Sequence, residues 1–310
     1  MNAPESPKAA AVRARAHRLE RGFLFGIAAY ALWGVIPIYF KLLKGVPLFD
    51  IVAHRVLWSL PLLTLLIIAA RGWAKVRAAL AQPRTIGVLV LTALLIAGNW
   101  LLYVYAVTSG HILASSFGYY LNPLANVLLG RFVLKERLSR LQWTAVAIAA
   151  AGISVLAAGA LSQLWISLTL CITFALYGLL RKVVAADAVT GLAIETALLF
   201  PLAILWLAVR GSGGAPVMGT TEMQTGLLIG AGLVSTTPLI LFNAAARRLP
   251  YSTMGMLQFI APTLQFLIAV LLYKEPFGPA HAVAFGAIWT ALFLYVTAMA
   301  RAPRLPQPPE

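Results

Sequence analysis

The chain has very little charge and almost no cysteine. Only 11% of its residues are charged and 61% are hydrophobic, whereas an average soluble domain has about 25% charged residues. A water-soluble chain of 310 residues could not bury that much apolar surface, which excludes a soluble fold. The one cysteine, Cys171, cannot form an intramolecular disulfide, and this argues against redox chemistry and Cys-based metal binding.

Motifs of soluble enzymes are missing as well. The sequence has no GxxxxGK[ST] segment to hold nucleotide phosphates and no HExxH segment to bind zinc. The four histidines lie too far apart in sequence to suggest a local metal site. No apolar segment pairs two carboxylates for acid/base chemistry. We therefore expect no metal, no cofactor and no enzymatic activity, and a nucleotide-driven pump would need a further domain or partner.

Long apolar segments fill most of the chain. About 20 apolar residues span a bilayer as a helix, and the connections between the segments are short. The sequence therefore predicts an all-α membrane protein with ten transmembrane helices in one bundle. A basic tail (1–21) precedes this bundle, and a Pro-rich tail (300–310), expected to be disordered, follows it. The expected helices lie near residues 22–40, 52–70, 86–107, 112–133, 141–159, 162–180, 191–209, 225–245, 252–272 and 281–299.

Two stretches of the sequence, 139 residues apart, resemble each other. Residues 120–123 (YLNP) and 259–262 (FIAP) are each followed, eleven residues later, by a Lys-Glu pair. The halves 22–159 and 162–299 each contain five expected helices. An odd number of crossings places the second copy upside down, so we expect two inverted five-helix repeats, as in many secondary transporters. Pro123 and Pro262 are equivalent positions, and we expect both to kink their helices and act as hinges.

The net charge of +15 is unevenly distributed. With the N-terminus in the cytoplasm, 19 of the 24 Lys and Arg residues lie inside, Arg181 among them, and four lie outside. Arg55 is left near a membrane boundary. This asymmetry fits the positive-inside rule, so we expect both termini to be cytoplasmic. It also argues against nucleic acid as a partner and favours contact of the basic surface with anionic membrane lipids.

Few ionisable residues fall within the apolar segments, where such groups are costly. Arg55 and Glu195 occupy equivalent positions of the two halves, so inversion places them at opposite faces and we do not expect them to pair. Arg55 is a candidate gate or contact for a substrate carboxylate. Glu195 and His54 are candidates for gating or for a proton-sensitive role. Each of these groups could instead lie at interfacial depth and reach the headgroups.

Aromatic and amide side chains recur along the same segments. Amides at mid-membrane depth need hydrogen-bond partners, which a hydrated cavity supplies. Tyr and Trp also anchor helices at the headgroup belts, and amides also join helices, so both interpretations remain open.

Several runs of residues carry a family resemblance. The sequence resembles RarD-type proteins of the EamA group in the drug/metabolite transporter superfamily, from about Gly22 to Met299. The resemblance implies a bacterial inner-membrane protein that exports small metabolites, such as amino acids or drug-like compounds, through a central cavity between the repeats. It identifies no native substrate. The runs are 29–34 (AYALWG), 54–59 (HRVLWS), 98–103 (GNWLLY), 118–124 (GYYLNPL) and 259–263 (FIAPT).

The resemblance also implies which residues line the pathway. Rings would stack on the substrate, amides would hydrogen-bond to it, and Arg55 would recognise its charge. The expected partners are a small-molecule substrate and membrane lipids, with the chain a monomer or a homodimer. Two alternatives stay open, a membrane-embedded enzyme acting on a lipid-linked substrate and a channel-like facilitator. The implied substrate-binding residues are Trp33, Arg55, Asn99, Trp100, Tyr103, Tyr119, Asn122 and Gln258.

Overall fold

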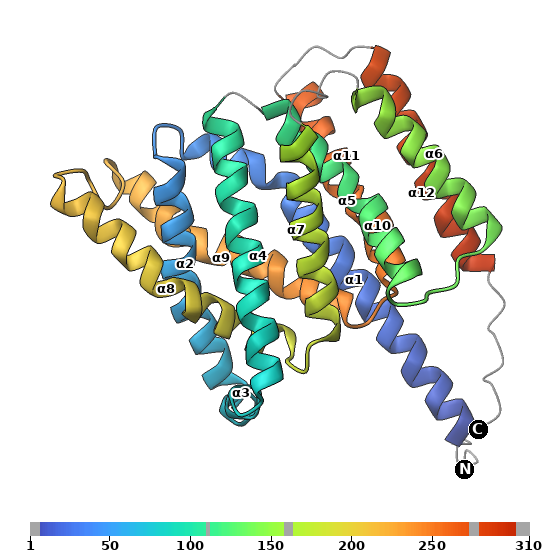
Figure 1. Cartoon of the computed structure of the whole chain (residues 1–310), viewed down its shortest axis with the longest axis horizontal. Coiled ribbons are helices and arrows are strands. Elements are labelled where there is room, and N and C mark those ends of the chain that lie inside the picture. Colours follow the sequence, from blue (N-terminus) through green and yellow to red (C-terminus); the bar gives the residue numbers. More distant parts are fainter. Residues whose placement is uncertain (1–6, 110–111, 158–163, 273–278, 302–310) are drawn as a thin grey trace.

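The computed structural model describes residues 7–109, 112–157, 164–272 and 279–301. Helices dominate these residues and no strand occurs among them, which confirms the expected all-α class. Figure 1 shows the helices gathered into one bundle. In chain order they are α1 (Pro7–Leu42), α2 (Leu48–Ala69), α3 (Trp73–Leu80), α4 (Pro83–Thr108), α5 (Ile112–Phe132), α6 (Arg140–Ala157), α7 (Leu164–Val183), α8 (Ala188–Ser212), α9 (Glu222–Ala246), α10 (Tyr251–Gln258), α11 (Ile260–Leu267), the π-helical turn η2 (Ile268–Leu272) and α12 (Pro279–Arg301).

The apolar segments expected from the sequence fall on these helices, with three differences. Helix α1 begins at Pro7, within the expected tail 1–21, and the expected segment 252–272 is divided into α10, α11 and η2. Residues 158–159 and 162–163, at the ends of two expected segments, lie outside the described residues. Among the described residues, eight helical stretches are long and apolar enough to cross a membrane. A shorter apolar helix covers Arg140–Val155. The chain is thus a multi-pass membrane protein, while the count of ten crossings and the inversion of the repeats stay predictions. The eight stretches are Ala16–Leu42, Leu48–Ala69, Pro83–Ala106, Leu164–Val183, Ala188–Ser212, Glu222–Ala246, Tyr251–Leu272 and Ala282–Arg301.

Helices of the two halves of the chain pack against each other. Helix α2 contacts α8 and α9, α4 contacts α7 and α8, and α5 contacts α7 and α10. Helices α6 and α12 lie side by side at one edge of the bundle (Figure 1). The core lies between the halves, where Tyr30 and Phe242 are fully buried. Any space at the centre of the bundle is therefore lined by both halves.

The Lys-Glu pair after α5 joins the halves at one end. The Glu136 carboxylate accepts hydrogen bonds from the backbone N–H of Tyr251 and of Ser252, and from the Ser252 hydroxyl at 2.6 Å. These N–H groups open α10 and have no partner within their own helix. A negative charge at a helix N-terminus also complements the helix dipole. Glu136 of the first half therefore caps a helix of the second half.

The two prolines expected to act as hinges have different surroundings. Pro123 lies inside the continuous helix α5. Pro262 is the third residue of α11, which is separated from α10 by Phe259 alone. The two segments approach closely at Gly255, where an added Cβ would lie 2.5 Å from the Pro123 carbonyl oxygen. Only glycine allows this crossing of α5 and α10.

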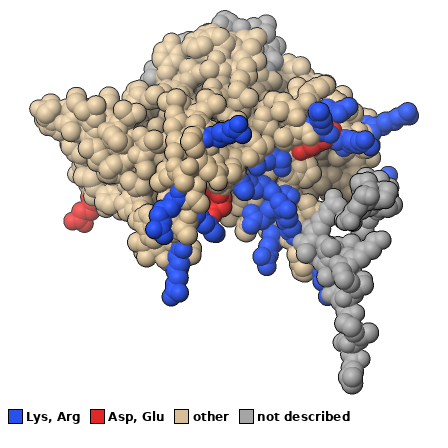
Figure 2. Space-filling model, turned by 60° about the horizontal axis from the view of Figure 1, so that its bottom comes forward, with Lys and Arg blue, Asp and Glu red and all other residues tan. Residues whose placement is uncertain are grey.

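Lys and Arg side chains gather on one side of the molecule (Figure 2). On this side, the N-terminal half of α1 contributes Arg18 and Arg21, and the turn after α9 contributes Arg247 and Arg248. Helix α7 also ends on this side, where the Lys182 ammonium donates a hydrogen bond to the Ala246 carbonyl at 2.8 Å. We refer to this end of the bundle as the basic face.

Candidate functional site

A small cavity lies at the centre of the bundle. Its volume is about 20 Å³, which is room for about one water molecule. Five helices line it, α2 and α4 from the first half and α7, α8 and α9 from the second. Polar groups on its wall alternate with aliphatic ones. The lining residues are Arg55, Val56, Ser59, Ile96, Trp100, Tyr177, Leu192, Glu195, Thr196, Leu199, Ser235, Thr236 and Leu239.

Arg55 supplies positive charge to this cavity. Its guanidinium carbon lies 4.1 Å from the centre of the Trp100 ring, in cation–π contact. Its Nε atom is buried and has no hydrogen-bond partner among the described residues. No carboxylate of the described part of the chain forms an ion pair with it. Arg55 therefore presents an uncompensated charge to whatever enters the cavity.

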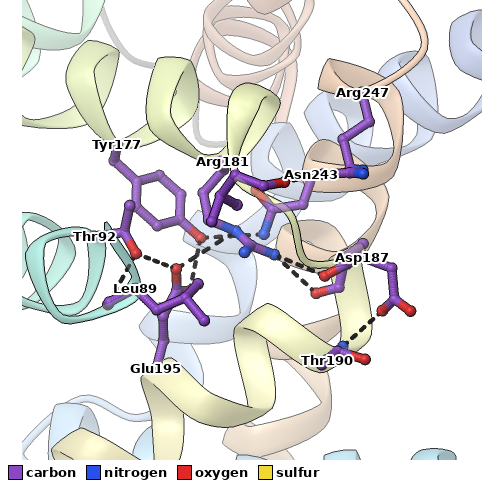
Figure 3. A network of polar contacts seen from close by, with 11 residues as sticks. Leu89, Thr92, Tyr177, Arg181, Asp187, Thr190, Glu195, Asn243 and Arg247 are labelled. Atoms are coloured by element: carbon purple, nitrogen blue, oxygen red, sulfur yellow. Dashed lines mark hydrogen bonds and ion pairs between the residues drawn. The ribbon is translucent and has the colours of Figure 1, made fainter. Parts of the chain in front are cut away.

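Glu195 lies on the cavity wall within a buried polar network (Figure 3). Its carboxylate accepts a hydrogen bond from Thr92 Oγ1 at 2.5 Å and one from Tyr177 Oη at 3.4 Å. The Arg181 Nε atom lies 3.5 Å away, with both charged side chains almost fully buried. Asn243 Nδ2 donates to Tyr177 Oη at 3.2 Å. The network ties α4, α7, α8 and α9 together.

Arg181 extends this network from the cavity toward the basic face. Its Nη2 atom donates to the carbonyls of Asp187 and Ala188, at 3.2 and 3.1 Å, in the turn between α7 and α8. Its Nη1 atom has no partner among the described residues. An added Cβ on Gly191 would lie 1.8 Å from Nη1, so the guanidinium packs directly on the backbone of α8. The side chain is 0% exposed, so Arg181 lies within the bundle rather than among the exposed cations of the basic face.

The turn that holds Arg181 is itself fixed to the surface. Asp187 is the N-cap of α8, and its side chain accepts from the Thr190 N–H at 2.8 Å. Its other carboxylate oxygen lies 3.4 Å from the exposed Lys75 ammonium of α3. A chain of polar contacts thus leads from Glu195 on the cavity wall, through Arg181 and Asp187, to the basic face.

His54 lies in α2, away from the cavity lining. Its Nε2 atom is 2.8 Å from the Val217 carbonyl, and Trp58 Nε1 donates to its Nδ1 atom at 3.3 Å. A carbonyl needs a proton on Nε2, and the indole N–H needs a lone pair on Nδ1, so both contacts fit the neutral ring. His54 therefore holds the connection between α8 and α9, on the side away from the basic face.

Other predicted site residues lie outside the lining of the cavity. Asn99 donates to the Leu170 carbonyl at 2.9 Å and to Thr173 Oγ1 at 2.8 Å, and accepts from Tyr119 Oη at 3.2 Å. These bonds satisfy its amide within the protein. The Tyr103 ring lies 5.8 Å from the Tyr119 ring. This cluster borders the cavity region through Trp100, the next residue after Asn99.

Trp33 and two amides have separate environments. Trp33 packs in an aromatic cluster, with ring centres 5.9 Å from Phe174 and 5.6 Å from Phe242. Gln258 Oε1 accepts from Asn126 Nδ2 at 2.9 Å, between α10 and α5. Both polar atoms of the Asn122 side chain are buried without a partner among the described residues. Of the predicted residues, the cavity brings together Arg55, Trp100 and Glu195.

The sequence interpretation missed Arg181, Gly191 and Thr92 as parts of the network. The sequence spacing contains a signal for Arg181 and Gly191. Tyr177 and Arg181 are four residues apart on α7, and Gly191 and Glu195 are four residues apart on α8. Residues at this spacing share a helix face, so two such pairs on consecutive helices could meet.

Comparison with known proteins gives consistent results. A family model described as the EamA-like transporter family matches residues 20–158. An uncharacterized transporter of Pseudomonas aeruginosa is 44% identical over 295 residues, which cover 94% of this chain and 98% of that protein. Protein RarD of Escherichia coli (strain K12) is 43% identical and is matched over 91% of this chain and 95% of its own length.

A solved crystal structure also resembles the bundle. It superposes with a TM-score of 0.72 at 20% sequence identity, over 93% of this chain and 100% of that one. Similarity at this level of identity establishes the shared fold alone.

Proposed function

The chain belongs to the EamA-like transporter family as a RarD-type protein, and from this premise we propose that it exports small metabolites across the bacterial inner membrane. The proposed mechanism is alternating access, in which the central cavity opens to one side at a time. The observation that carries the proposal is a central cavity lined by helices of both halves, with Arg55 and Glu195 on its wall.

The charges around the cavity favour a substrate that carries an anionic group. Glu195 and Arg181 are paired with each other, so their charges cancel. Arg55 then leaves one positive charge unbalanced, stacked on Trp100. A carboxylate could accept hydrogen bonds from this guanidinium, and amino acids and drug-like acids both carry one. A cavity of about 20 Å³ holds neither, so binding requires the helices to separate.

The Glu195 network is the proposed barrier on the basic face. It lies between the cavity and the α7–α8 turn and joins four helices, so substrate cannot pass there until Arg181 leaves its site. Glu195 serves as the gating and proton-sensitive group, because neutralising it would remove the partner of a buried cation. His54 has the corresponding gating role on the other side, through the Val217 carbonyl.

Orientation and hinges complete the proposal. We place the basic face in the cytoplasm, in accordance with the positive-inside rule, so both termini are cytoplasmic. Pro123 and Pro262 are the proposed hinges. Residues that do not line the closed cavity are proposed to reach the substrate when the bundle opens, namely Trp33, Asn99, Tyr103, Tyr119, Asn122 and Gln258.

The test is efflux from proteoliposomes loaded with labelled amino acids and small drug-like acids and amines, with and without a pH gradient. We expect saturable and selective efflux of carboxylate-bearing compounds. This efflux should be absent in the Arg55→Ala variant and retained in the control Arg77→Ala. Arg77 is an exposed residue of α3 and is not part of the cavity lining. If proteoliposomes that contain folded protein release none of the compounds, the export proposal is contradicted and an enzyme acting on a lipid-linked substrate is favoured. Unsaturable loss would favour a channel-like facilitator.

A further inference from the structure

An open hollow on the basic face has only cationic and histidine residues along its lining. Its volume is about 550 Å³. Part of the lining comes from the N-terminal half of α1 and part from the turn between α9 and α10, so segments near both ends of the sequence contribute. The residues are His17, Arg18, Arg21, Arg247 and Arg248.

Hydrogen bonds to carbonyl oxygens hold three of the four arginines in place without neutralising them. Arg18 Nη2 donates to the Arg247 carbonyl at 3.0 Å, Arg247 Nη1 to the Val184 carbonyl at 2.7 Å, and Arg248 Nη1 to the Ala244 carbonyl at 2.7 Å. Carbonyl oxygens carry no net charge. Within the described ranges, no carboxylate forms an ion pair with any of the four lining arginines. The Glu20 carboxylate lies 3.6 Å from His17 Nδ1, so the four arginines still give the hollow an excess of positive charge.

The electrostatics of Arg247 report the same excess of positive charge. Burial lowers the pKa of Arg247, and the neighbouring cations Arg181, Arg248 and Arg18 lower it further, against the opposing effect of Asp187. An anion in the hollow would relieve this repulsion and favour the charged guanidinium.

The hollow lies where the chain enters the membrane. The apolar run of α1 begins directly after Arg21, and the Arg248 guanidinium lies 5.2 Å from the Phe25 ring centre. Leu24 and Ile27, three and six residues after Arg21 on α1, are 60% and 45% exposed. An anionic lipid headgroup could therefore contact the arginines of the hollow while its acyl chains contact Leu24 and Ile27, all within two helical turns. A soluble phosphate could use only the arginines.

We propose that this hollow binds the phosphate of one anionic phospholipid, whose acyl chains lie along the exposed side of α1. Arginine suits this role because its planar fork pairs with phosphate oxygens, and basic pockets at the cytoplasmic ends of helices bind such headgroups. Because Arg21 and Arg248 come from different halves of the chain, the lipid bridges them. A bound lipid would thereby hold α1 against the α9–α10 turn.

The test measures thermal unfolding of the purified full-length protein in detergent, titrated with dioleoyl phosphatidylglycerol, dioleoyl phosphatidylcholine or soluble glycerol phosphate. We expect phosphatidylglycerol alone to raise the melting temperature with saturation, since a ligand that binds the folded state stabilises it. The Arg21→Gln/Arg248→Gln variant should require roughly 30-fold more phosphatidylglycerol, from the usual contribution of two basic residues near a charged lipid surface.

A matched control separates a site from general surface charge. The Arg77→Gln/Arg137→Gln variant also removes two exposed arginines from the same end of the bundle, and it should keep the wild-type response. Equal weakening in both double variants, or an equal shift with phosphatidylcholine, would overturn the proposal. An equal shift with glycerol phosphate would overturn it too, in favour of a soluble anion. None of these readouts depends on transport, so failure here is distinct from failure of the export proposal.

Discussion

Replacing Gly191 by alanine should open the barrier on the basic face. The new Cβ would lie 1.8 Å from Arg181 Nη1 and 2.6 Å from Cζ, whereas ordinary contact begins near 3.4 Å. The guanidinium has to shift, and we expect this shift to break its bonds to Asp187 and Ala188 and its pairing with Glu195. Disrupting a buried ion pair costs about 3–5 kcal/mol. At the lower limit, the population with an open barrier rises about 100-fold.

The assay uses accessibility of one engineered cysteine. Ser59→Cys, in a Cys171→Ser background, places a thiol of similar size on the cavity wall. We expect a membrane-impermeant thiol reagent, added from the basic-face side of oriented vesicles, to label this cysteine tens of times faster in Gly191→Ala. Gly87→Ala is the control, because an added Cβ there meets nothing within 4 Å. A folded Gly191→Ala protein that is labelled at the parental rate would refute the barrier.

Five further substitutions test other parts of the structure. Arg55→Lys keeps the charge but loses the planar fork, so we expect efflux assays to show a higher KM for carboxylates and a smaller loss than Arg55→Ala; an unchanged KM for both would indicate a snorkelling residue. Glu195→Gln should abolish the response of transport to a pH gradient while substrate binding persists, and a retained response would assign coupling elsewhere. Pro123→Ala and Pro262→Ala should slow turnover more than they weaken binding if the kinks are hinges, whereas equal loss of expression would indicate a folding role. Glu136→Gln should lower stability by about 1–2 kcal/mol in thermal unfolding, since α10 loses a charged cap; no change would mean that the cap contributes little.

The helices and the charged cavity residues could be predicted from local sequence. A segment long and apolar enough to span a bilayer has few alternatives, which is why the expected segments coincide with helices. A charge inside such a segment stands out for the same reason, and Arg55 and Glu195 were found in this way. Both line the same small cavity at the centre of the bundle, so the expectation that inversion places them at opposite faces was wrong. The expectation that they do not pair agrees with the structure, where Glu195 pairs with Arg181.

The partner of Glu195 could not be predicted in the same way. Arg181 lies in the last turn of α7 beside Lys182, where a cation usually points to the headgroups. Its burial depends on carbonyls of the following turn and on the missing side chain at Gly191, which are tertiary features. Trp33 was expected to line the pathway but packs on Phe174. The sequence cannot distinguish these two environments, because a ring that faces a cavity and a ring that packs on another ring have the same sequence pattern.

The cap that Glu136 provides for α10 has a consequence for biogenesis. During synthesis the first half enters the membrane before residues 251–258 have been made. The Glu136 carboxylate therefore lacks its N–H donors until α10 has been synthesised. Helices α2, α4 and α5 likewise wait for their partners in the second half. A ribosome that stalled after the first half would leave an inserted but unassembled intermediate, exposed to membrane quality control. Assembly of this protein is therefore a late event, completed only when the last helices arrive.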